Sequence, residues 1–419
     1  AVRTSANMHS RLFYSFLLLL PITYTNEGKH SIEEEYCKLN FGIIDKNVII
    51  KTWYSFLLSD LIKPYQTKLK LKCKRGRQEL NINIPPNFIN SIAFYEDVNI
   101  NTRYKQTHLQ YYLNAAKDIH KDNVAALAHK CVEESNQLVI KRLENIYDYI
   151  FIDEIQDYAG WDLEIIKIMF ESLINVRCVG DFKQATFRTN NSRKNSKYRD
   201  DAIKDYFLKL QKDKLCTVEY SNVTRRFNKE ICDFINTIHS DKESMVIPFS
   251  VDTTIENAGV YIIDSKSIDL YCKKYQPTML RYNKAYKMSF HHHCDVFNYG
   301  NSKGATFERV VIVPVSTVTP FIKEGKNISS KQTKSKFYVA CTRAKHSVVF
   351  VLDNVKESNL FKRILLDIDG EKINAFLDAY ISRHPNCFNN DIQRKKAGKE
   401  FNTVLFPVLP DMNEKRTLL

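Results

Sequence analysis

The sequence predicts an α/β protein whose sheets are mostly parallel. Short runs rich in β-branched and apolar residues predict strands at residues 146–152, 176–179, 310–315 and 348–352. After the first run, apolar residues recur at helical spacing, namely Leu163, Ile166, Met169, Phe170 and Leu173. Strands that alternate with helices are typical of parallel sheets, because a crossover between parallel strands needs a helix-length segment.

Length and composition predict more than one domain. The chain has 419 residues, of which 44% are hydrophobic and 26% charged, as expected of a globular protein with two or three cores. A polar, charge-rich segment over 192–214 favours a boundary there. We therefore expect a first domain at residues 1–205, a second at 206–380 and a loosely held tail at 381–419.

The net charge and the cysteine spacing indicate which partners and which cellular compartment suit the chain. Lys and Arg number 62 against 48 Asp and Glu, and this net charge of +14 favours a polyanionic partner. The ten cysteines include no C-x-x-C pair, which argues against a zinc ribbon or a disulfide framework. A reduced, cytoplasmic setting fits best, and no membrane partner is expected.

The apolar run at residues 12–22 has two interpretations. It could be the core of a signal peptide, since Arg3 and Arg11 precede it, or a buried helix-to-strand connection of the first domain. It is too short to span a bilayer. We favour the buried connection.

The most informative stretch is the run Tyr149-Ile-Phe-Ile-Asp-Glu-Ile-Gln-Asp157. A buried strand that ends in two adjacent acids delivers carboxylates to the edge where an open α/β sheet binds its ligands. Hydrolysis of a nucleoside triphosphate needs one carboxylate to hold Mg²⁺ and another to activate water. Asp153 and Glu154 are the candidates for these two roles.

Further motifs follow in an order that suits the same chemistry. Gly180-Asp-Phe-Lys-Gln184 ends the next strand with a carboxamide that could sense the terminal phosphate. Arg226 and Arg343 could supply positive charge to the transition state from a second domain. Each residue alone could be an ordinary surface group, but their order makes coincidence a poor explanation.

That order resembles the UvrD/Rep-like family of superfamily 1 DNA helicases, over roughly residues 22–352. Asp153–Asp157 is similar to the family's Walker B motif and Gly180–Gln184 to its coupling motif. Val339-Ala-Cys-Thr-Arg-Ala344 is close to the Val-Ala-x-Thr-Arg-Ala signature, and Ser302-Lys-Gly-Ala-Thr-Phe307 resembles the Lys-Gly-Leu-Glu-Phe motif. Arg226 stands where the family has the arginine of Asn-Tyr-Arg-Ser.

The resemblance implies two RecA-like domains of the P-loop NTPase type, an ATP–Mg²⁺ cofactor, and 3′-to-5′ movement along single-stranded DNA. Residues implied in catalysis are Asp153, which would hold Mg²⁺, Glu154, Gln184, Arg226 and Arg343. Residues implied in nucleotide binding are Asp153, Gln184, Gly304, Thr306 and Arg343. Residues implied along the DNA strand are Thr25, Asn26, Thr52, Phe56, Phe187, Arg188 and Ser302.

The chain also departs from the family pattern. The phosphate loop G-x-x-x-x-G-K-[ST] occurs nowhere in the 419 residues. Since the first Met is at position 8, we expect a truncated chain whose first domain is incomplete; a degenerate, inactive relative is the alternative. Thr306 replaces an expected Glu, Gly300 stands where many members have His, and Thr189 replaces a Trp near the stacking aromatic Phe187.

Spacing indicates a compact member of the family. Too few residues separate Arg226 from Lys303 for the large accessory insertion of the long helicases, whereas residues 63–145 leave room for a small one. Compact members are often coupled to a nuclease or another partner, as in phage-defence systems. Such a partner is an expectation here.

Three other segments carry competing interpretations. Residues 68–77 alternate basic and apolar side chains, typical of a DNA-backbone track or of a solvated edge strand protected by lysines. The basic residues of 188–199 are better candidates for phosphate contacts. His291-His-His-Cys294 invites a metal site, but neighbouring residues of a strand point to opposite faces, so we do not expect one.

Two functional hypotheses therefore remain open. The first is an ATP-dependent 3′-to-5′ DNA helicase or translocase. The second is a nucleic-acid-binding or partner-regulating protein that keeps the helicase fold without turnover. The acid pair, Gln184, Arg226 and Arg343 favour the first.

Overall fold

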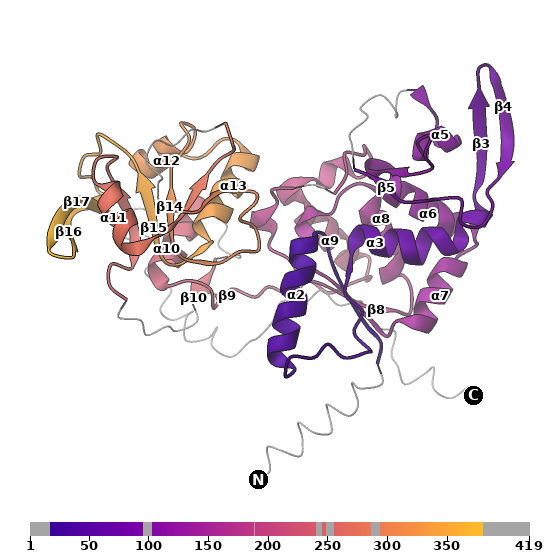
Figure 1. The fold of residues 1–419 in the computed structure, drawn as a ribbon, viewed down its shortest axis with the longest axis horizontal. Helices are drawn as coiled ribbons and strands as arrows, with labels where there is room; N and C mark the ends of the chain where they lie inside the picture. The colour runs from indigo at the N-terminus through magenta and orange to yellow at the C-terminus, as the bar shows by residue number, and fades with distance from the viewer. Residues whose placement is uncertain are drawn as a thin grey trace, which may run out of the picture. The chain divides into compact units, whose positions relative to one another are not determined.

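A computed structural model describes residues 17–94, 103–187, 189–239, 245–248, 255–285 and 294–379. The chain forms two compact units (Figure 1). The first takes in the described residues up to Phe182 together with 189–219. The second takes in Lys183–Phe187 and the described residues from Tyr220 onwards.

The first unit is built on a four-stranded parallel sheet in the order β2-β1-β7-β8. Its strands are β1 (Leu19–Thr23), β2 (Lys51–Thr52), β7 (Tyr149–Ile152) and β8 (Asn175–Cys178). Ile152 is in register with Ile22 on one side and Cys178 on the other. Parallel pairing therefore brings the carboxyl ends of β1, β7 and β8 to one edge of the sheet.

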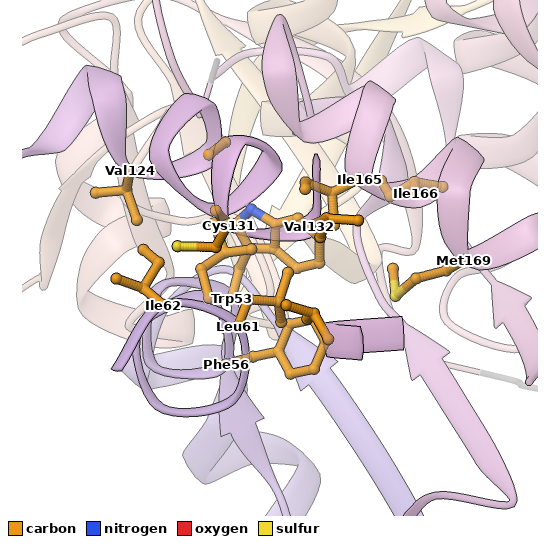
Figure 2. Close-up of a cluster of buried hydrophobic side chains, with 14 of the residues drawn as sticks. Trp53, Phe56, Leu61, Ile62, Val124, Cys131, Val132, Ile165, Ile166 and Met169 are labelled. Carbon is orange, nitrogen blue, oxygen red and sulfur yellow. The ribbon is translucent and has the colours of Figure 1, made fainter. Parts of the chain in front are cut away.

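Helices and helical turns surround this sheet and fill a single core. They are α2 (Asn26–Leu39), α3 (Trp53–Phe56) with its π-helical continuation η1 (Leu57–Ile62), η2 (Lys63–Lys68), α5 (Leu109–Tyr112), η3 (Lys121–Asn123), α6 (Val124–Glu134), α7 (Leu138–Ile146), η4 (Ile155–Asp157), α8 (Trp161–Phe170), η6 (Ser196–Tyr198), η7 (Asp200–Ala202) and α9 (Ile203–Lys212). Figure 2 shows Trp53 and Phe56 of α3 beside apolar side chains of α6 and α8. Both aromatic rings are fully buried, with ring centroids 5.6 Å apart.

The region between α3 and β7 adds two small sheets to the first unit. A hairpin of β3 (Lys70–Arg75) and β4 (Gln78–Asn83) projects from the unit (Figure 1). The parallel pair β5 (Ile92–Ala93) and β6 (Ile119–His120) lies elsewhere in the same region.

The second unit holds a seven-stranded sheet in the order β13-β12-β14-β15-β11-β17-β16. Its strands are β11 (Gly259–Ile263), β12 (Thr278–Arg281), β13 (Val296–Asn298), β14 (Phe307–Ile312), β15 (Ala344–Val351), β16 (Phe361–Ile368) and β17 (Glu371–Asp378). Pairing is parallel from β13 to β11, and only β17 and β16 run antiparallel at one edge. A separate parallel pair joins β9 (Val223–Thr224) to β10 (Ile247–Pro248).

Alternate residues of the central strands face two different apolar clusters. Val260 and Ile262 of β11 pack with residues of α10 (Lys229–Ile238), α12 (Thr319–Glu324) and α13 (Lys331–Cys341). Tyr261 and Ile263 pack instead with residues of α11 (Ile268–Tyr275). Since both faces are covered, the strands read as continuous apolar runs, as is usual for parallel sheets.

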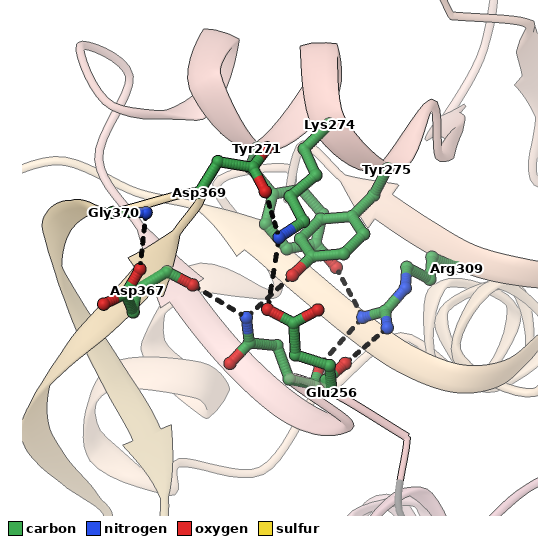
Figure 3. Close-up of polar contacts among 9 residues, drawn as sticks. Glu256, Tyr271, Lys274, Tyr275, Arg309, Asp367, Asp369 and Gly370 are labelled. Atoms are coloured by element: carbon green, nitrogen blue, oxygen red, sulfur yellow. Dashed lines mark hydrogen bonds and ion pairs between the residues drawn. The ribbon is translucent and has the colours of Figure 1, made fainter.

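Arg309, a buried arginine on β14, contacts a loop, a helix and a neighbouring strand of the second unit (Figure 3). Arg309 is 8% exposed. Its guanidinium contacts the carbonyls of Glu256 and Asn257, the Ser347 hydroxyl, and the face of the Tyr275 ring, whose centroid is 4.2 Å away. Nearby, Lys274 lies 2.7 Å from the Asp369 carboxylate at the β16–β17 turn. These contacts fix α11 and the antiparallel hairpin against the parallel sheet.

The predicted α/β class with mostly parallel sheets is confirmed. Individual boundaries differ from the prediction. The strand predicted over 146–152 begins later than expected, at Tyr149, because Ile146 is the last residue of α7. Leu173, expected on a helix, lies beyond α8 and is 63% exposed. Within the described ranges, no helix is long and apolar enough to cross a membrane. The tail at 381–419 lies outside those ranges.

Candidate functional site

The acid pair lies at the carboxyl end of β7 in the first unit. Backbone bonds hold it from both neighbouring strands: the Asp153 N–H donates to the Ile22 carbonyl at 2.8 Å, and the Ile155 N–H donates to the Val179 carbonyl at 3.0 Å. Between them, Glu154 adopts a left-handed backbone conformation with φ 54° and ψ 40°. Such a conformation is uncommon outside glycine and recurs at functional sites. Both acids remain partly exposed.

Gln156 positions the Glu154 carboxylate. Its Nε2 donates to Glu154 Oε2, while its Oε1 accepts from the Asp181 backbone N–H at 3.1 Å. Gly180 leaves room for this side chain, because a Cβ at that position would lie 2.2 Å from Gln156 Oε1. The loop after β8 is therefore linked to the acid pair through one carboxamide. Sequence reasoning missed Gln156, although its place inside the acidic run is a usable signal.

A second polar cluster, the Asp162 network, lies buried in the first unit. Asp162 is 1% exposed, and its carboxylate accepts hydrogen bonds from Trp53 Nε1 at 2.7 Å, Asn190 Nδ2 at 2.7 Å and the Thr189 hydroxyl. Thr189 in turn accepts from the Ala159 N–H at 2.9 Å. Burial raises the pKa of Asp162 to about 6, and the three hydrogen bonds offset part of that rise.

The Asp162 network explains one departure from the helicase pattern. Thr189, which stands where a Trp was expected, is fully buried and its carbonyl also accepts from the Tyr54 hydroxyl at 2.7 Å. An indole would not fit inside this cluster. Sequence reasoning missed Asp162 and Asn190, because a buried carboxylate and a buried amide carry no periodic signal.

The residues expected along a DNA strand fall into two groups within the first unit. Thr25 and Asn26 are exposed, and Thr25 Oγ1 caps α2 by accepting from the Gly28 N–H at 2.9 Å. Thr52 is partly exposed and caps α3. Phe56 is different: it is fully buried against Trp53, so it packs the core and has no surface to offer a nucleic acid. We therefore remove Phe56 from the predicted interface.

In the second unit, Arg343 and Gln184 are hydrogen-bonded to each other. Arg343 is 1% exposed, and its Nη2 donates to Gln184 Oε1 at 3.0 Å. The same guanidinium donates to the Val339 carbonyl at 3.0 Å and the Ala305 carbonyl at 3.3 Å. The arginine thus joins the end of α13 to the loop before β14 and to the carboxamide predicted to sense phosphate.

The loop before β14 carries other predicted residues. Gly304 has φ +84°, and a Cβ there would meet no atom within 4 Å, so the loop is open at this point. Thr306 is exposed. Ser302 is fully buried, and its hydroxyl donates to the Tyr299 carbonyl at 2.8 Å, so the predicted DNA contact at Ser302 is not supported by its position. Arg226 is partly exposed beside β9.

Phe187 retains an accessible ring. It is 43% exposed and lies against Gly300, where a Cβ would come within 3.0 Å of the ring. This contact gives a structural reason for glycine at the position where many helicases have His. Arg188, and His291–His293 of the considered metal motif, lie outside the described residues. Among the described residues, no group of three or more His, Cys, Asp or Glu side chains is placed to hold a metal.

Residues 29–203 match the UvrD/REP helicase N-terminal domain family. The match runs from α2 to the first residue of α9 and includes the acid pair, Gln156 and the Asp162 network. This chain contains a UvrD/REP helicase N-terminal domain. The family resemblance predicted from the motifs is thus confirmed, and with the parallel sheets it supports a RecA-like fold.

Three similar solved structures are viral proteins whose titles call them helicases. Arterivirus nonstructural protein 10 is 14% identical with a TM-score of 0.30, and the match covers 49% of this chain and 39% of that one. Its complex with DNA is 14% identical with a TM-score of 0.28, over 48% and 39%. PRRSV nsp10 is 15% identical with a TM-score of 0.19, over 49% and 36%.

The matched part of this chain thus spans about two fifths of the arterivirus proteins. At these TM-scores the likeness decides nothing about fold or activity. No curated protein sequence matches the chain.

Proposed function

We propose that this chain is part of an ATP-driven UvrD-type motor that moves 3′-to-5′ along single-stranded DNA. The observation that carries the proposal is the acid pair of the UvrD/REP domain, held between β1 and β8 at the carboxyl end of β7. A nucleotide-hydrolysing site needs carboxylates in a fixed position at that edge of the sheet.

The two acids take different roles in this proposal. Asp153 would hold Mg²⁺; it is partly exposed at a strand end, and Mg²⁺ needs only one or two carboxylates when substrate phosphates and waters complete its shell. Bound there, the ion would neutralise charge on the transferred phosphoryl group. Glu154 would orient and deprotonate the attacking water, with its carboxylate fixed by Gln156.

Residues of the second unit have supporting roles. Gln184 and Arg343 would report the terminal phosphate, since a group that draws either one away must break their shared hydrogen bond. Arg226 would add positive charge, and the open loop at Gly304 and Thr306 would contact the nucleotide. Thr25, Asn26, Thr52, Phe187 and Arg188 would follow the DNA strand.

The alternative is a helicase-like protein that binds nucleic acid or regulates a partner without turnover. Two observations favour it: the 419 residues contain no G-x-x-x-x-G-K-[ST] loop, and the Arg343 guanidinium is already occupied by protein acceptors. A nuclease or phage-defence partner stays a prediction under either proposal.

DNA-stimulated ATP hydrolysis and strand displacement test the two proposals. Without backbone amides and a lysine to cradle the phosphates, we expect no measurable ATPase from the 419 residues alone. Joined to a phosphate-loop segment of a UvrD/REP helicase, the chain should hydrolyse ATP and displace a strand from a 3′-tailed duplex but not from a 5′-tailed one. Strand binding with no hydrolysis in the joined protein would favour the alternative.

A further inference from the structure

The β3–β4 hairpin carries a dense positive charge. Residues 68–83 contain six basic side chains, Lys68, Lys70, Lys72, Lys74, Arg75 and Arg77, and one acid, Glu79, which leaves a net charge of +5. All six basic residues are exposed. Gly76, with φ +61°, and Arg77 form the two-residue turn between Arg75 and Gln78, so both arginines lie at the tip of the hairpin.

The hairpin is held firmly where it leaves the unit. Leu71 is 2% exposed, and the Lys72 N–H donates to the Thr107 carbonyl at 2.9 Å. Gln110 makes two further bonds to the Lys74 backbone, at 3.2 Å to its N–H and 2.8 Å to its carbonyl. Because β3 is fixed along its length by a neighbouring segment, its charges are presented in a set arrangement.

Glu79, the one acidic residue of the hairpin, pairs with two neighbouring side chains. Glu79 contacts the buried His108 ring at 3.0 Å and the Lys72 ammonium at 3.3 Å, and hydrogen bonds from these two groups lower its pKa. Lys70 lies 3.8 Å from Glu134 but is 84% exposed. Among the described residues, no carboxylate lies within ion-pair distance of Lys74, Arg75 or Arg77. Most of the positive charge therefore faces solvent.

The distribution of these charges fits a duplex better than a single strand. Lys70, Lys72 and Lys74 alternate with Leu71 and Cys73, so the lysines lie on one face of the ribbon. Arg75 lies on the opposite face, and Arg77 at the turn. A two-stranded ribbon fits the major groove of B-form DNA, where charges on two sides meet the phosphates of both strands.

The side-chain types in the hairpin support the same choice. Residues 68–83 include no aromatic side chain, and single-strand binders depend on aromatic rings on which bases stack. Gln78, Asn81 and Asn83 add amide groups that can donate to phosphate oxygens. A-form RNA offers a deep, narrow major groove that a ribbon does not enter.

We propose that the β3–β4 hairpin is a binding surface for the phosphate backbone of duplex DNA. The inference rests on the proposed motor function in one respect: a motor at a junction of single-stranded and duplex DNA has a duplex beside the strand that it follows. The interaction itself needs neither ATP nor turnover.

Binding of the 419-residue protein to a blunt DNA duplex, measured by fluorescence anisotropy across a salt series, tests the proposal. The hairpin variant carries Arg75→Gln and Arg77→Gln; the control carries Lys209→Gln and Lys212→Gln, which remove equal charge from exposed positions of α9. The hairpin variant should bind duplex more weakly, and the slope of log K against log salt should become shallower by about 0.9 for each phosphate that is no longer neutralised. The control should bind like the parent.

Two further measurements separate a loss of charge at the hairpin from a general loss of nucleic-acid binding. A charge-keeping variant, Arg75→Lys with Arg77→Lys, should recover most duplex affinity, and single-strand affinity should be nearly unchanged in all variants. Equal duplex affinity in the hairpin variant and the parent would overturn the proposal, as would an equal weakening in the hairpin and control variants or an equal affinity for duplex RNA. If the parent binds no single strand yet its duplex binding depends on the hairpin, the motor function fails while the hairpin proposal stands.

Discussion

The indole Nε1 of Trp53 lies 2.7 Å from Oδ1 of Asp162 in the core of the first unit. Trp53 begins the helix that Thr52 caps, and Asp162 lies in the first turn of the helix that follows the acid pair. Thr189 and Asn190 reach the same carboxylate from the segment after Phe187. The helix that Trp53 begins, the helix of Asp162 and the segment after Phe187 are therefore joined through one buried carboxyl group.

Replacing Asp162 should destabilise the first unit. Asp162→Ala leaves three buried donors without their acceptor, and each such donor costs about 1–3 kcal/mol, so we expect the free energy of unfolding to fall by roughly 3 kcal/mol or more. Urea denaturation followed by Trp fluorescence measures it. The control Asp205→Ala removes an exposed carboxylate from α9 and should change stability by less than about 0.5 kcal/mol. Similar destabilisation in both variants would contradict a special role for the network.

Asp162 should also give stability a distinctive pH dependence. Burial raises its pKa in the folded state to about 6, above its ordinary value of 3.8, so the folded protein holds the proton more tightly than the unfolded chain. Its contribution to stability should therefore fall as pH rises from about 4 to 6 and stay constant above that, a change on the order of 2–3 kcal/mol.

The matched measurement is the difference in unfolding free energy between the parent and Asp162→Asn, recorded from pH 4 to 8. Asn keeps the shape of the side chain but cannot titrate. A difference that does not vary between pH 4 and 6 would show that the folded carboxylate titrates near its ordinary pKa.

Replacing Glu154 should separate ATP hydrolysis from ATP binding. In the chain joined to a phosphate-loop segment, Glu154→Gln should abolish DNA-stimulated ATP hydrolysis while ATP binding persists, because Asp153 is left in place for Mg²⁺. Colorimetric phosphate release and binding of a fluorescent ATP analogue separate the two effects. Unchanged turnover would sink the assignment of the water-activating carboxylate.

Gly180→Ala offers an independent check on how Glu154 is held. The added methyl would meet Gln156 Oε1 at 2.2 Å and displace the carboxamide that binds the Glu154 carboxylate. Turnover should drop while ATP and DNA affinities stay near those of the parent. Gly42→Ala is the matched control, because it replaces a glycine of the same unit with open space around it, although its positive φ adds some strain.

The sequence predicted the parallel α/β class and the acid pair because both leave local patterns. A strand buried on both faces reads as an apolar run, and the two carboxylates that end β7 interrupt that run abruptly. Positions such as Phe56 and Ser302 could not be judged in this way. Both residues match motif positions, yet both are buried in the folded chain. Phe56 packs in the core, and the Ser302 hydroxyl bonds to the backbone of its own loop.

Polar residues that act through the folded core were invisible for a related reason. Asp162, Thr189 and Asn190 come together only because α8 and the segment after Phe187 pack on α3. Arg309 is a similar case, since its partners come from a loop, a helix and a neighbouring strand. Their roles follow from tertiary contacts that single-sequence periodicity does not encode.

Single-strand binding should depend on Phe187. Its ring is 43% exposed, and a ring that stacks on a base contributes about 1–3 kcal/mol, so Phe187→Ala should weaken binding of the 419-residue protein to single-stranded DNA by that amount. Gly300→Ala should weaken binding too, because its methyl comes within 3.0 Å of the ring and shifts it. Phe41→Ala, which removes a ring that is 83% exposed in the first unit, is the matched control and should have no effect. Fluorescence anisotropy with single-stranded oligonucleotides measures these affinities. With oligonucleotides of several sequences, binding should show little base preference and a steep salt dependence.

If Phe187→Ala binds single-stranded DNA as well as the parent does, the fold serves something other than tracking a strand.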